Sequence, residues 1–156
     1  MKLKIGQKAP AFALSDQDGK THTLKNYAGQ WVLVYFYPKD DTPGCTVEAC
    51  GFRDYLPKFK KSKLVVLGVS ADTVASHKKF AKKFGLPFPL LSDETKTTIK
   101  KYGAWGKKSF MGRTYDGIFR TSFLIDPRGV IAKIYEKVKP AVHPVEVFSD
   151  LTNFIS

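Results

Sequence analysis

Both cysteines of the chain, Cys45 and Cys50, lie in the stretch Thr-Pro-Gly-Cys-Thr-Val-Glu-Ala-Cys that starts at Thr42. Threonine can cap a helix, and the following Pro43 suits the first helical position. Cys45 is therefore expected in a first helical turn, where unpaired peptide N–H groups and the helix dipole favour an anion. A thiol placed there should ionise more readily, and the thiolate is the nucleophilic form. The stretch predicts one reactive cysteine with a second cysteine close by.

The spacing of the two cysteines restricts how they can pair. On one intact helix, residues five apart have Cα atoms roughly 8–9 Å apart, and their side chains point to different faces. A disulfide needs Cα atoms within about 7 Å of each other. Either Cys45 and Cys50 never pair, or pairing requires part of the helix to unwind.

Two other interpretations of the cysteines are open. In an intracellular chain they could be small buried apolar residues. Zinc usually takes about four ligands, with paired cysteines about two to four residues apart, whereas His22, His77 and His143 are scattered along the chain. The position of Cys45 at a helix start favours a reactive cysteine over a buried apolar residue or a zinc ligand.

Length and composition predict one domain over residues 1–156. The chain has 156 residues and a hydrophobic content of 43%, enough for a full core. No apolar run approaches the ~20 residues of a membrane span, and residues 1–6 lack the apolar core of a signal peptide. We therefore expect a cytoplasmic protein in a reducing environment, where cysteines more often serve chemistry or metal binding than stable disulfides.

The chain is strongly basic, with 26 Lys and Arg against 14 Asp and Glu and a net charge of +12. Such a balance raises the hypothesis of nucleic-acid binding. The lysine doublets at 60–61, 78–79 and 82–83 fall on expected helices and indicate solvated faces, and no nucleic-acid motif is present. We expect no specific nucleic-acid partner, and attribute the charge to solubility or to steering of an acidic partner.

Hydrophobic patterning predicts the order of the elements. The expected strands are 11–14 and 21–24 around an Asp-Gly turn, 31–37, 64–70, 88–91, 119–125 and 130–135, and the expected helices are 43–61, 73–84, 93–102 and 143–155. Parallel strands joined by helices, followed by a terminal hairpin and helix, predict an α/β, thioredoxin-like fold. In it a central mixed β-sheet is flanked by helices and preceded by an N-terminal β-hairpin.

On the helix at 73–84, His77 is expected on or beside the apolar stripe rather than as a metal ligand. Residues 103–117 form the longest stretch without an assigned element, and it is rich in aromatic residues. We interpret it as a long loop that either covers a site or packs on the core.

Arg120 stands out because it places a cation in the apolar run 119–125. A buried cation needs a partner, although the residue could instead lie at the strand end and reach water. If it is buried, Glu48 and the Cys45 thiolate are suitable partners, since Glu48 lies three residues beyond Cys45 on a neighbouring helix face. Its guanidinium could then favour the thiolate and bind an oxygen that develops negative charge.

These residues together resemble a known family. Pro38-x-x-x-Thr42-x-x-Cys45, with Arg120 before Thr-Ser-Phe-Leu-Ile-Asp, is similar to the motif of the peroxiredoxins, and Cys50 five residues later resembles their Q-type subgroup, also called bacterioferritin comigratory protein. The resemblance covers nearly the whole chain. It implies a thiol-dependent peroxidase that reduces hydrogen peroxide and organic hydroperoxides.

The resemblance also implies the roles of the two cysteines. Cys45 would be the peroxidatic cysteine, which becomes a sulfenic acid, and Cys50 the resolving cysteine, which forms an intramolecular disulfide with it. Thioredoxin or a related dithiol would reduce that disulfide, as in an atypical 2-Cys enzyme. No metal, haem, flavin or other cofactor would be needed, because sulfur carries the electrons.

The remaining site residues follow from the same resemblance. Thr42, Arg120 and the backbone N–H of Cys45 would hold the peroxide oxygens as the O–O bond lengthens. Pro38 would shield the thiolate from solvent, and Glu48 would orient Arg120.

Two alternative functions belong to other classes of protein. The chain could be a thioredoxin-like binding module with a basic surface and inert cysteines. It could also be a disulfide oxidoreductase, although such enzymes favour Cys-x-x-Cys over the four-residue gap found here. We expect no membrane partner, and a monomer or at most a weak dimer.

Overall fold

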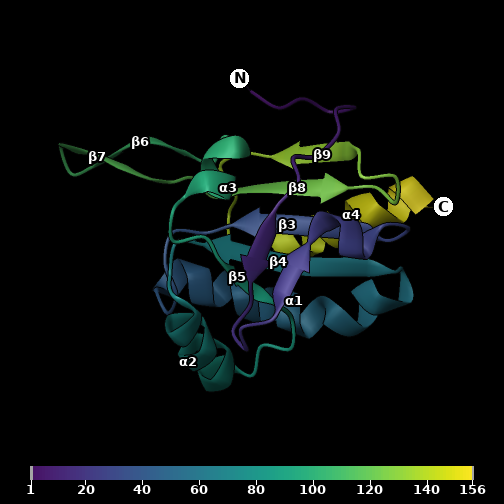
Figure 1. Cartoon of the computed structure of the whole chain (residues 1–156), viewed down its shortest axis with the longest axis horizontal. Coiled ribbons are helices and arrows are strands. Elements are labelled where there is room, and N and C mark those ends of the chain that lie inside the picture. Colours follow the sequence, from purple (N-terminus) through teal and green to yellow (C-terminus); the bar gives the residue numbers. More distant parts are fainter. Residues whose placement is uncertain (1, 156) are drawn as a thin grey trace.

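A seven-stranded mixed sheet forms the centre of the molecule (Figure 1), which is described by a computed structural model for residues 2–155. The strands are β1 (Ala13–Ser15), β2 (Thr21–Thr23), β3 (Trp31–Phe36), β4 (Leu64–Ser70), β5 (Leu90–Ser92), β6 (Trp105–Phe110), β7 (Arg113–Ile118), β8 (Thr121–Ile125) and β9 (Ile131–Tyr135). The helices are α1 (Pro43–Lys61), α2 (Val74–Phe84), α3 (Thr97–Lys101) and α4 (His143–Ile155), with a short 3₁₀ helix at Leu24–Tyr27. The strand order is β2-β1-β5-β4-β3-β8-β9, and β6 pairs only with β7.

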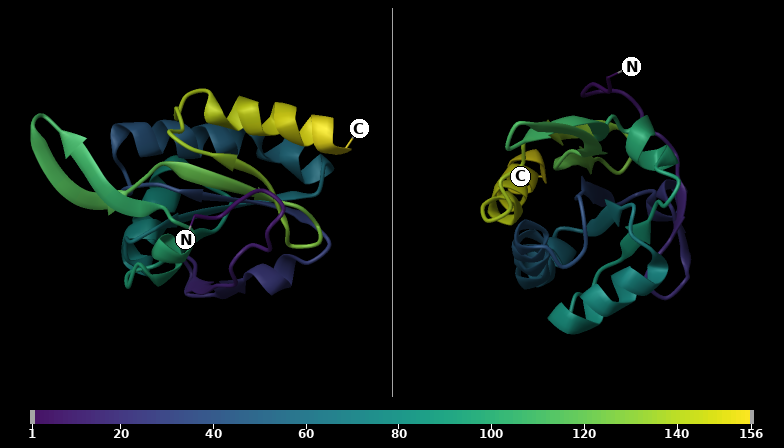
Figure 2. Two further views of the ribbon diagram at one scale, coloured as in Figure 1. Left: turned by 90° about the horizontal axis from the view of Figure 1, so that it is seen from above. Right: turned by 90° about the vertical axis from the view of Figure 1, so that its left-hand side faces the viewer.

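The sheet combines parallel and antiparallel pairs. β3, β4 and β5 are parallel neighbours, whereas β8 runs antiparallel to β3, and β9 antiparallel to β8. Along β3, Leu33 and Tyr35 belong to the core cluster shared with α1, α2 and α4, and Val32 and Val34 belong to the cluster on the other face. Helices thus flank both faces (Figure 2). The predicted thioredoxin-like fold with its N-terminal β1–β2 hairpin is confirmed.

Helix α1 begins at the predicted position and carries both cysteines. Pro43 is its first residue, and the bond from Thr46 N to Thr42 O, 2.8 Å long, starts the helical ladder. Every third or fourth residue is buried, including Cys45, Phe52 and Phe59, so this face packs on the sheet. The helix continues through Pro57 to Lys61.

The interpretation of residues 103–117 as a loop is wrong, because they form most of the β6–β7 hairpin, which extends away from the body of the molecule (Figure 1). The predicted strand at 88–91 lies instead at Leu90–Ser92, and the helix predicted at 93–102 is shorter. Asp93 accounts for the late start of α3, since its Oδ2 accepts the N–H of Ile99 at 2.8 Å. Between residues 2 and 155, no helix is both long and apolar enough to cross a membrane.

Candidate active site

Cys45, Arg120 and Glu48 form one contact group at the start of α1. Arg120 Nη2 donates to the Sγ of Cys45 at 3.1 Å, and Arg120 Nη1 donates to Glu48 Oε1 at 3.1 Å. Cys45 and Glu48 are both 1% exposed, whereas the Arg120 side chain is 20% exposed. The structure therefore brings together three residues that lie up to 75 positions apart, and a guanidinium at this distance stabilises a thiolate.

Glu48 has a pKa well above the ordinary value of a glutamate. Its burial raises its pKa from the ordinary value of 4.5 to about 8, although the charge of Arg120 and its hydrogen bond act in the opposite direction. The second carboxyl oxygen, Oε2, is buried and has no hydrogen-bond partner within residues 2–155. A carboxyl group that is partly protonated near neutral pH neutralises Arg120 only in part, so the guanidinium keeps positive charge available to Cys45.

Arg120 reaches Cys45 because of two local features, of which sequence reasoning raised the first as an alternative and missed the second. The residue lies just before β8 rather than inside a strand, and its backbone carbonyl accepts the N–H of Val138 at 3.2 Å. Its side chain then passes Gly44 so closely that a Cβ there would lie 2.7 Å from Nη2. Any side chain at position 44 would push the guanidinium aside. Gly44 is thus a site residue, and the Pro-Gly-Cys context was its only signal in the sequence.

Thr42 and Pro38 lie on the loop between β3 and α1, and both are half-buried. The backbone of Thr42 occupies the N-cap position, but its hydroxyl does not cap the helix as predicted. It donates instead to the carbonyl of Lys39 at 2.9 Å, which leaves the oxygen free to accept a hydrogen bond. The N–H of Cys45 has no backbone acceptor in the described part of the chain, since the helical ladder starts at Thr46.

Cys50 lies on the same continuous helix as Cys45, and both thiols are free. Cys45 is buried whereas Cys50 is partly exposed. The five-residue spacing places their Cα atoms about 8–9 Å apart, beyond the reach of a disulfide. The prediction that the thiol form keeps the two residues apart on one helix is confirmed.

A cavity of about 860 Å³ borders Arg120 on its outer side. Its walls combine apolar residues with lysines: Leu3, Tyr102, Phe119, Phe123, Ile134 and Val138 beside Lys2, Lys100, Lys108 and Lys137. Lys108 from β6 donates to the carbonyl of Ile118 at 2.8 Å, two residues before Arg120. Burial, and then the charge of Arg120, lower the pKa of Lys108. Sequence reasoning missed Lys108 because it assigned this region to a loop.

Comparisons with known proteins agree with this site. The profile of the AhpC/TSA family matches residues 5–134. Peroxiredoxin Bcp of Escherichia coli (strain K12) is 52% identical over 90% of each chain, and a putative peroxiredoxin bcp of Coxiella burnetii is 48% identical over 97% of this chain and 100% of its own. The structure of the bacterioferritin comigratory protein of Xanthomonas campestris matches with a TM-score of 0.91 and 37% identity, over 98% of this chain and 100% of that one.

These likenesses extend along nearly the whole chain and decide against the alternative of a binding module without peroxidase activity. A family profile that spans residues 5–134, relatives about half identical in sequence and a pair of cysteines at the start of α1 all agree. The chain therefore belongs to the AhpC/TSA family and, within it, to the Bcp/PrxQ peroxiredoxins, which are thiol peroxidases.

Proposed function

We propose that Cys45 is the peroxidatic cysteine, and that Arg120, Thr42, Pro38 and Glu48 form its peroxide-binding site. The observation that carries this assignment is the contact of 3.1 Å from Arg120 Nη2 to the Sγ of Cys45 at the start of α1. The partner thiol, Cys50, lies outside this contact group. A buried thiol that accepts a guanidinium donor in the first turn of a helix has the environment of a reactive thiolate.

The chemistry of the first step follows from these contacts. The Cys45 thiolate attacks the distal oxygen of the peroxide, the O–O bond breaks, and Cys45 becomes a sulfenic acid. The departing oxygen takes a proton and leaves as water or an alcohol. Arg120 and the N–H of Cys45 stabilise the charge on that oxygen, and the Thr42 oxygen accepts the O–H of the incoming peroxide.

Pro38 and Glu48 act around this centre. Pro38, half-buried on the loop before α1, limits the access of water to the thiolate. Glu48 holds one nitrogen of the guanidinium, so that the other nitrogen points at Cys45. A planar group with two fixed nitrogens keeps its orientation better than a single ammonium could.

Cys50 completes the cycle as the resolving cysteine. Its thiolate attacks Sγ of the Cys45 sulfenic acid, the S–O bond breaks, and the departing hydroxide takes up a proton and leaves as water, which yields an intramolecular disulfide. Because α1 holds the two Cα atoms about 8–9 Å apart, the first turns of the helix must unwind before this bond can form. Phe52 is fully buried just beyond Cys50, which favours an unwound segment that ends before it.

We assign hydrogen peroxide and alkyl hydroperoxides as substrates, with thioredoxin or a related dithiol as reductant. The relative from Xanthomonas campestris is described as having alkyl peroxide reduction activity, and the apolar cavity beside Arg120 offers space for an organic group. A thioredoxin-type reductant can reach and reduce a disulfide that lies in an unwound, accessible segment. We also propose that residues 1–156 act as one domain, since the central sheet takes strands from both halves of the chain. We propose further that the protein is a monomer or at most a weak dimer.

The decisive test compares the wild-type protein with Cys45→Ser in a peroxide assay driven by thioredoxin, thioredoxin reductase and NADPH. We expect the serine variant to lose all peroxide consumption above background, because a serine hydroxyl is not ionised at neutral pH. Cys50→Ser should still form a sulfenic acid at Cys45 that a dimedone probe traps. Full turnover by Cys45→Ser would refute the assignment.

A separate measurement tests the unwinding. Hydrogen exchange of residues 43–51 should be faster in the disulfide form than in the reduced form, because the peptide N–H groups lose their helical acceptors. Equal protection in the two forms would show that the disulfide forms without unwinding.

A further inference from the structure

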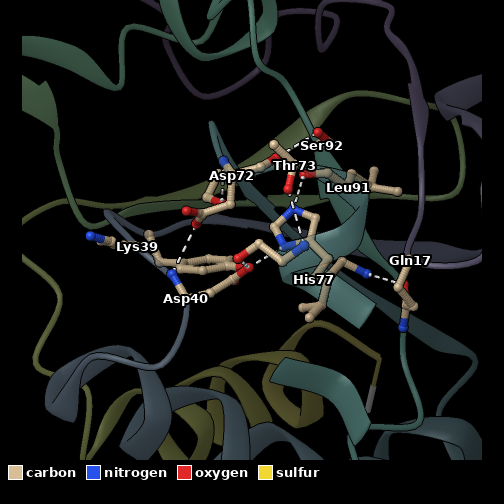
Figure 3. Close-up of polar contacts among 12 residues, drawn as sticks. Gln17, Lys39, Asp40, Asp72, Thr73, His77, Leu91 and Ser92 are labelled. Atoms are coloured by element: carbon tan, nitrogen blue, oxygen red, sulfur yellow. Dashed lines mark hydrogen bonds and ion pairs between the residues drawn. The ribbon is translucent and has the colours of Figure 1, made fainter. Parts of the chain in front are cut away.

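A second polar cluster holds the loop between β3 and α1 at Asp40. The buried carboxylate of Asp40 accepts hydrogen bonds from Tyr37 Oη at 2.6 Å, Ser76 Oγ at 2.8 Å and His77 Nδ1 at 2.7 Å. The backbone N–H of Asp40 donates to Asp72 Oδ2 at 2.9 Å. Figure 3 shows Asp40 between His77 of α2 and Asp72 after β4. Both the backbone and the side chain of Asp40 are thus fixed.

The composition of this cluster suggests a metal site, but its hydrogen bonds argue against one. Asp40, Asp72 and His77 each have a ligand-type atom, and these atoms lie within 4.8 Å of one another. However, Asp72 Oδ2 already accepts from Ser70 Oγ at 2.6 Å and from the Asp40 N–H. The Asp40 carboxylate accepts three donors. A cation would have to displace these bonds, so the cluster is a closed hydrogen-bond network.

The network defines where the proton of His77 lies. His77 Nε2 is 3.1 Å from the carbonyl oxygen of Leu91, which can only accept, so Nε2 carries a hydrogen. Nδ1 faces Asp40 Oδ2 at 2.7 Å, and a proton must lie between these two atoms as well. Tyr37 and Ser76 also donate to this carboxylate. Asp40 and His77 are therefore joined by a buried hydrogen bond of 2.7 Å.

The loop that this pair holds needs an external support. Asp41, the residue after Asp40, has a φ of 56°, a left-handed conformation that is costly for a residue other than glycine. Thr42 and Cys45 follow within four residues, so a change in the backbone at position 40 would move both. Asp40 is the point where α2 and the end of β4 fix this strained turn.

We propose that His77 is a positioning residue for the peroxidase reaction. By donating from Nδ1 to Asp40 it holds the Pro38–Thr42 segment in the conformation that binds peroxide, and it does not touch the peroxide itself. This inference rests on the proposed role of Cys45. Without the bond, the loop and the first turn of α1 leave the binding conformation more often. Oxidation of Cys45 then slows, whereas disulfide formation, which needs the unwound segment, does not.

Two substitutions separate the two hydrogen bonds of His77. In His77→Asn the amide nitrogen is as many bonds from Cβ as Nδ1, so it can still donate to Asp40. In His77→Gln the amide nitrogen corresponds to Nε2, so it can reach the carbonyl of Leu91 but not Asp40. The first variant keeps the proposed positioning contact and the second removes it.

The experiment measures two steps by stopped-flow tryptophan fluorescence after mixing the reduced protein with hydrogen peroxide. We expect His77→Gln to lower the second-order rate constant for Cys45 oxidation about tenfold or more, and His77→Asn to lower it no more than about threefold. The first-order rate constant for disulfide formation should be unchanged or higher in His77→Gln. Equal oxidation rates in the two variants, or equal slowing of both steps in His77→Gln, would overturn the proposal.

The chain offers a matched control. His22 on β2 is also buried, and its Nε2 lies 2.6 Å from Asp16 Oδ2, but β2 is at the far edge of the sheet from β3. His22→Gln should lower the melting temperature as His77→Gln does and leave the rate of Cys45 oxidation unchanged. If it slows oxidation equally, general destabilisation explains the effect and the proposal fails.

A milder substitution keeps the test possible if the His77 variants do not fold. Ser76→Ala removes one donor to Asp40 and leaves His77 in place, and we expect oxidation to slow about two- to fivefold. An unchanged rate in that variant would count against the network. Loss of oxidation in Cys45→Ser together with wild-type rates in the His77 variants would refute this inference alone, and not the proposed function.

Discussion

Two polar groups near the start of α1 differ in how completely their hydrogen-bonding atoms are satisfied. On one side, Glu48 Oε2 has no partner in the described chain, and the Arg120 side chain is partly exposed beside Cys45. On the other side, the Asp40 carboxylate accepts three donors, and both nitrogens of His77 are used. The first group includes a partly exposed guanidinium, which is the donor that the proposed peroxide-binding site uses. The second group can only hold the loop in place.

The ionisation of Glu48 reflects this difference. Glu48 has one charged partner and a raised pKa of about 8, because burial outweighs the effect of Arg120. A buried carboxylate with several donors needs less compensation from charge, since its lone pairs are satisfied. The carboxyl group beside the proposed reactive cysteine thus has fewer hydrogen-bond donors than the Asp40 carboxylate, which holds the loop.

The largest effect is expected from Arg120 itself. Arg120→Lys should lower the rate constant for Cys45 oxidation by about a hundredfold, because an ammonium cannot donate to Glu48 and Cys45 from two fixed nitrogens. Stopped-flow fluorescence with hydrogen peroxide measures this rate. A rate within about twofold of wild type would show that charge alone, rather than the shape of the guanidinium, is required.

Gly44→Ala tests the close approach of Arg120 to the helix. A Cβ at this position would lie 2.7 Å from Nη2, so the guanidinium must move away from Cys45. We expect oxidation to slow about tenfold, because small displacements at a reacting centre are costly. The melting temperature should change little, since alanine favours a helix and the end of an arginine side chain can shift. An unchanged rate would mean that Arg120 reaches Cys45 by another path.

Glu48→Gln tests the ionisation of Glu48. Because burial raises the pKa of Glu48 to about 8 in the folded protein, the folded state binds more protons than the unfolded state between the ordinary pKa and that value. The stability contributed by protonated Glu48 is fully present below about pH 4.5 and is lost as the pH rises through about 8. Relative to the glutamine variant, the wild-type free energy of unfolding should therefore fall across this window, by at most about 1.4 kcal/mol per pH unit.

Urea titrations of both proteins at several pH values across this window would measure the difference. A constant difference would indicate that Glu48 is ionised throughout and fully paired with Arg120. Glutamine has nearly the same volume as glutamate, so a change in packing does not contribute to the difference in the free energy of unfolding.

The smallest effect on peroxide reaction is expected for Cys50→Ser, because Cys50 belongs to neither polar group. Its first oxidation by peroxide should occur at the wild-type rate within about twofold, while turnover with thioredoxin should be lost for want of a disulfide. Competition with a second peroxidase would measure the first step. A large loss in that step would place Cys50 in the peroxide-binding site.

Local sequence was enough to predict much of this protein. Pro43 and the residues around Cys45 indicated the start of α1, and the alternating and continuous apolar runs indicated β3, β4, β8 and β9. The β6–β7 hairpin was missed, because it packs little on the core and lacks the apolar pattern that identifies a buried strand. The late start of α3 was missed because it depends on one side-chain acceptor, Asp93.

The sequence by itself indicated the residues that we propose to carry chemistry: a thiol at a helix start, a second thiol five residues on, and a cation in an apolar run. Tertiary structure decided what each of them meets. The contact of Arg120 with Cys45 spans 75 residues, and that of His77 with Asp40 spans 37. Only the packing of β8 beside β3 and of α2 against β5 brings these groups together, because no pattern within a few residues specifies the distance between elements. Within residues 2–155, the same packing leaves Glu48 Oε2 without a hydrogen-bond partner and gives the Asp40 carboxylate three donors.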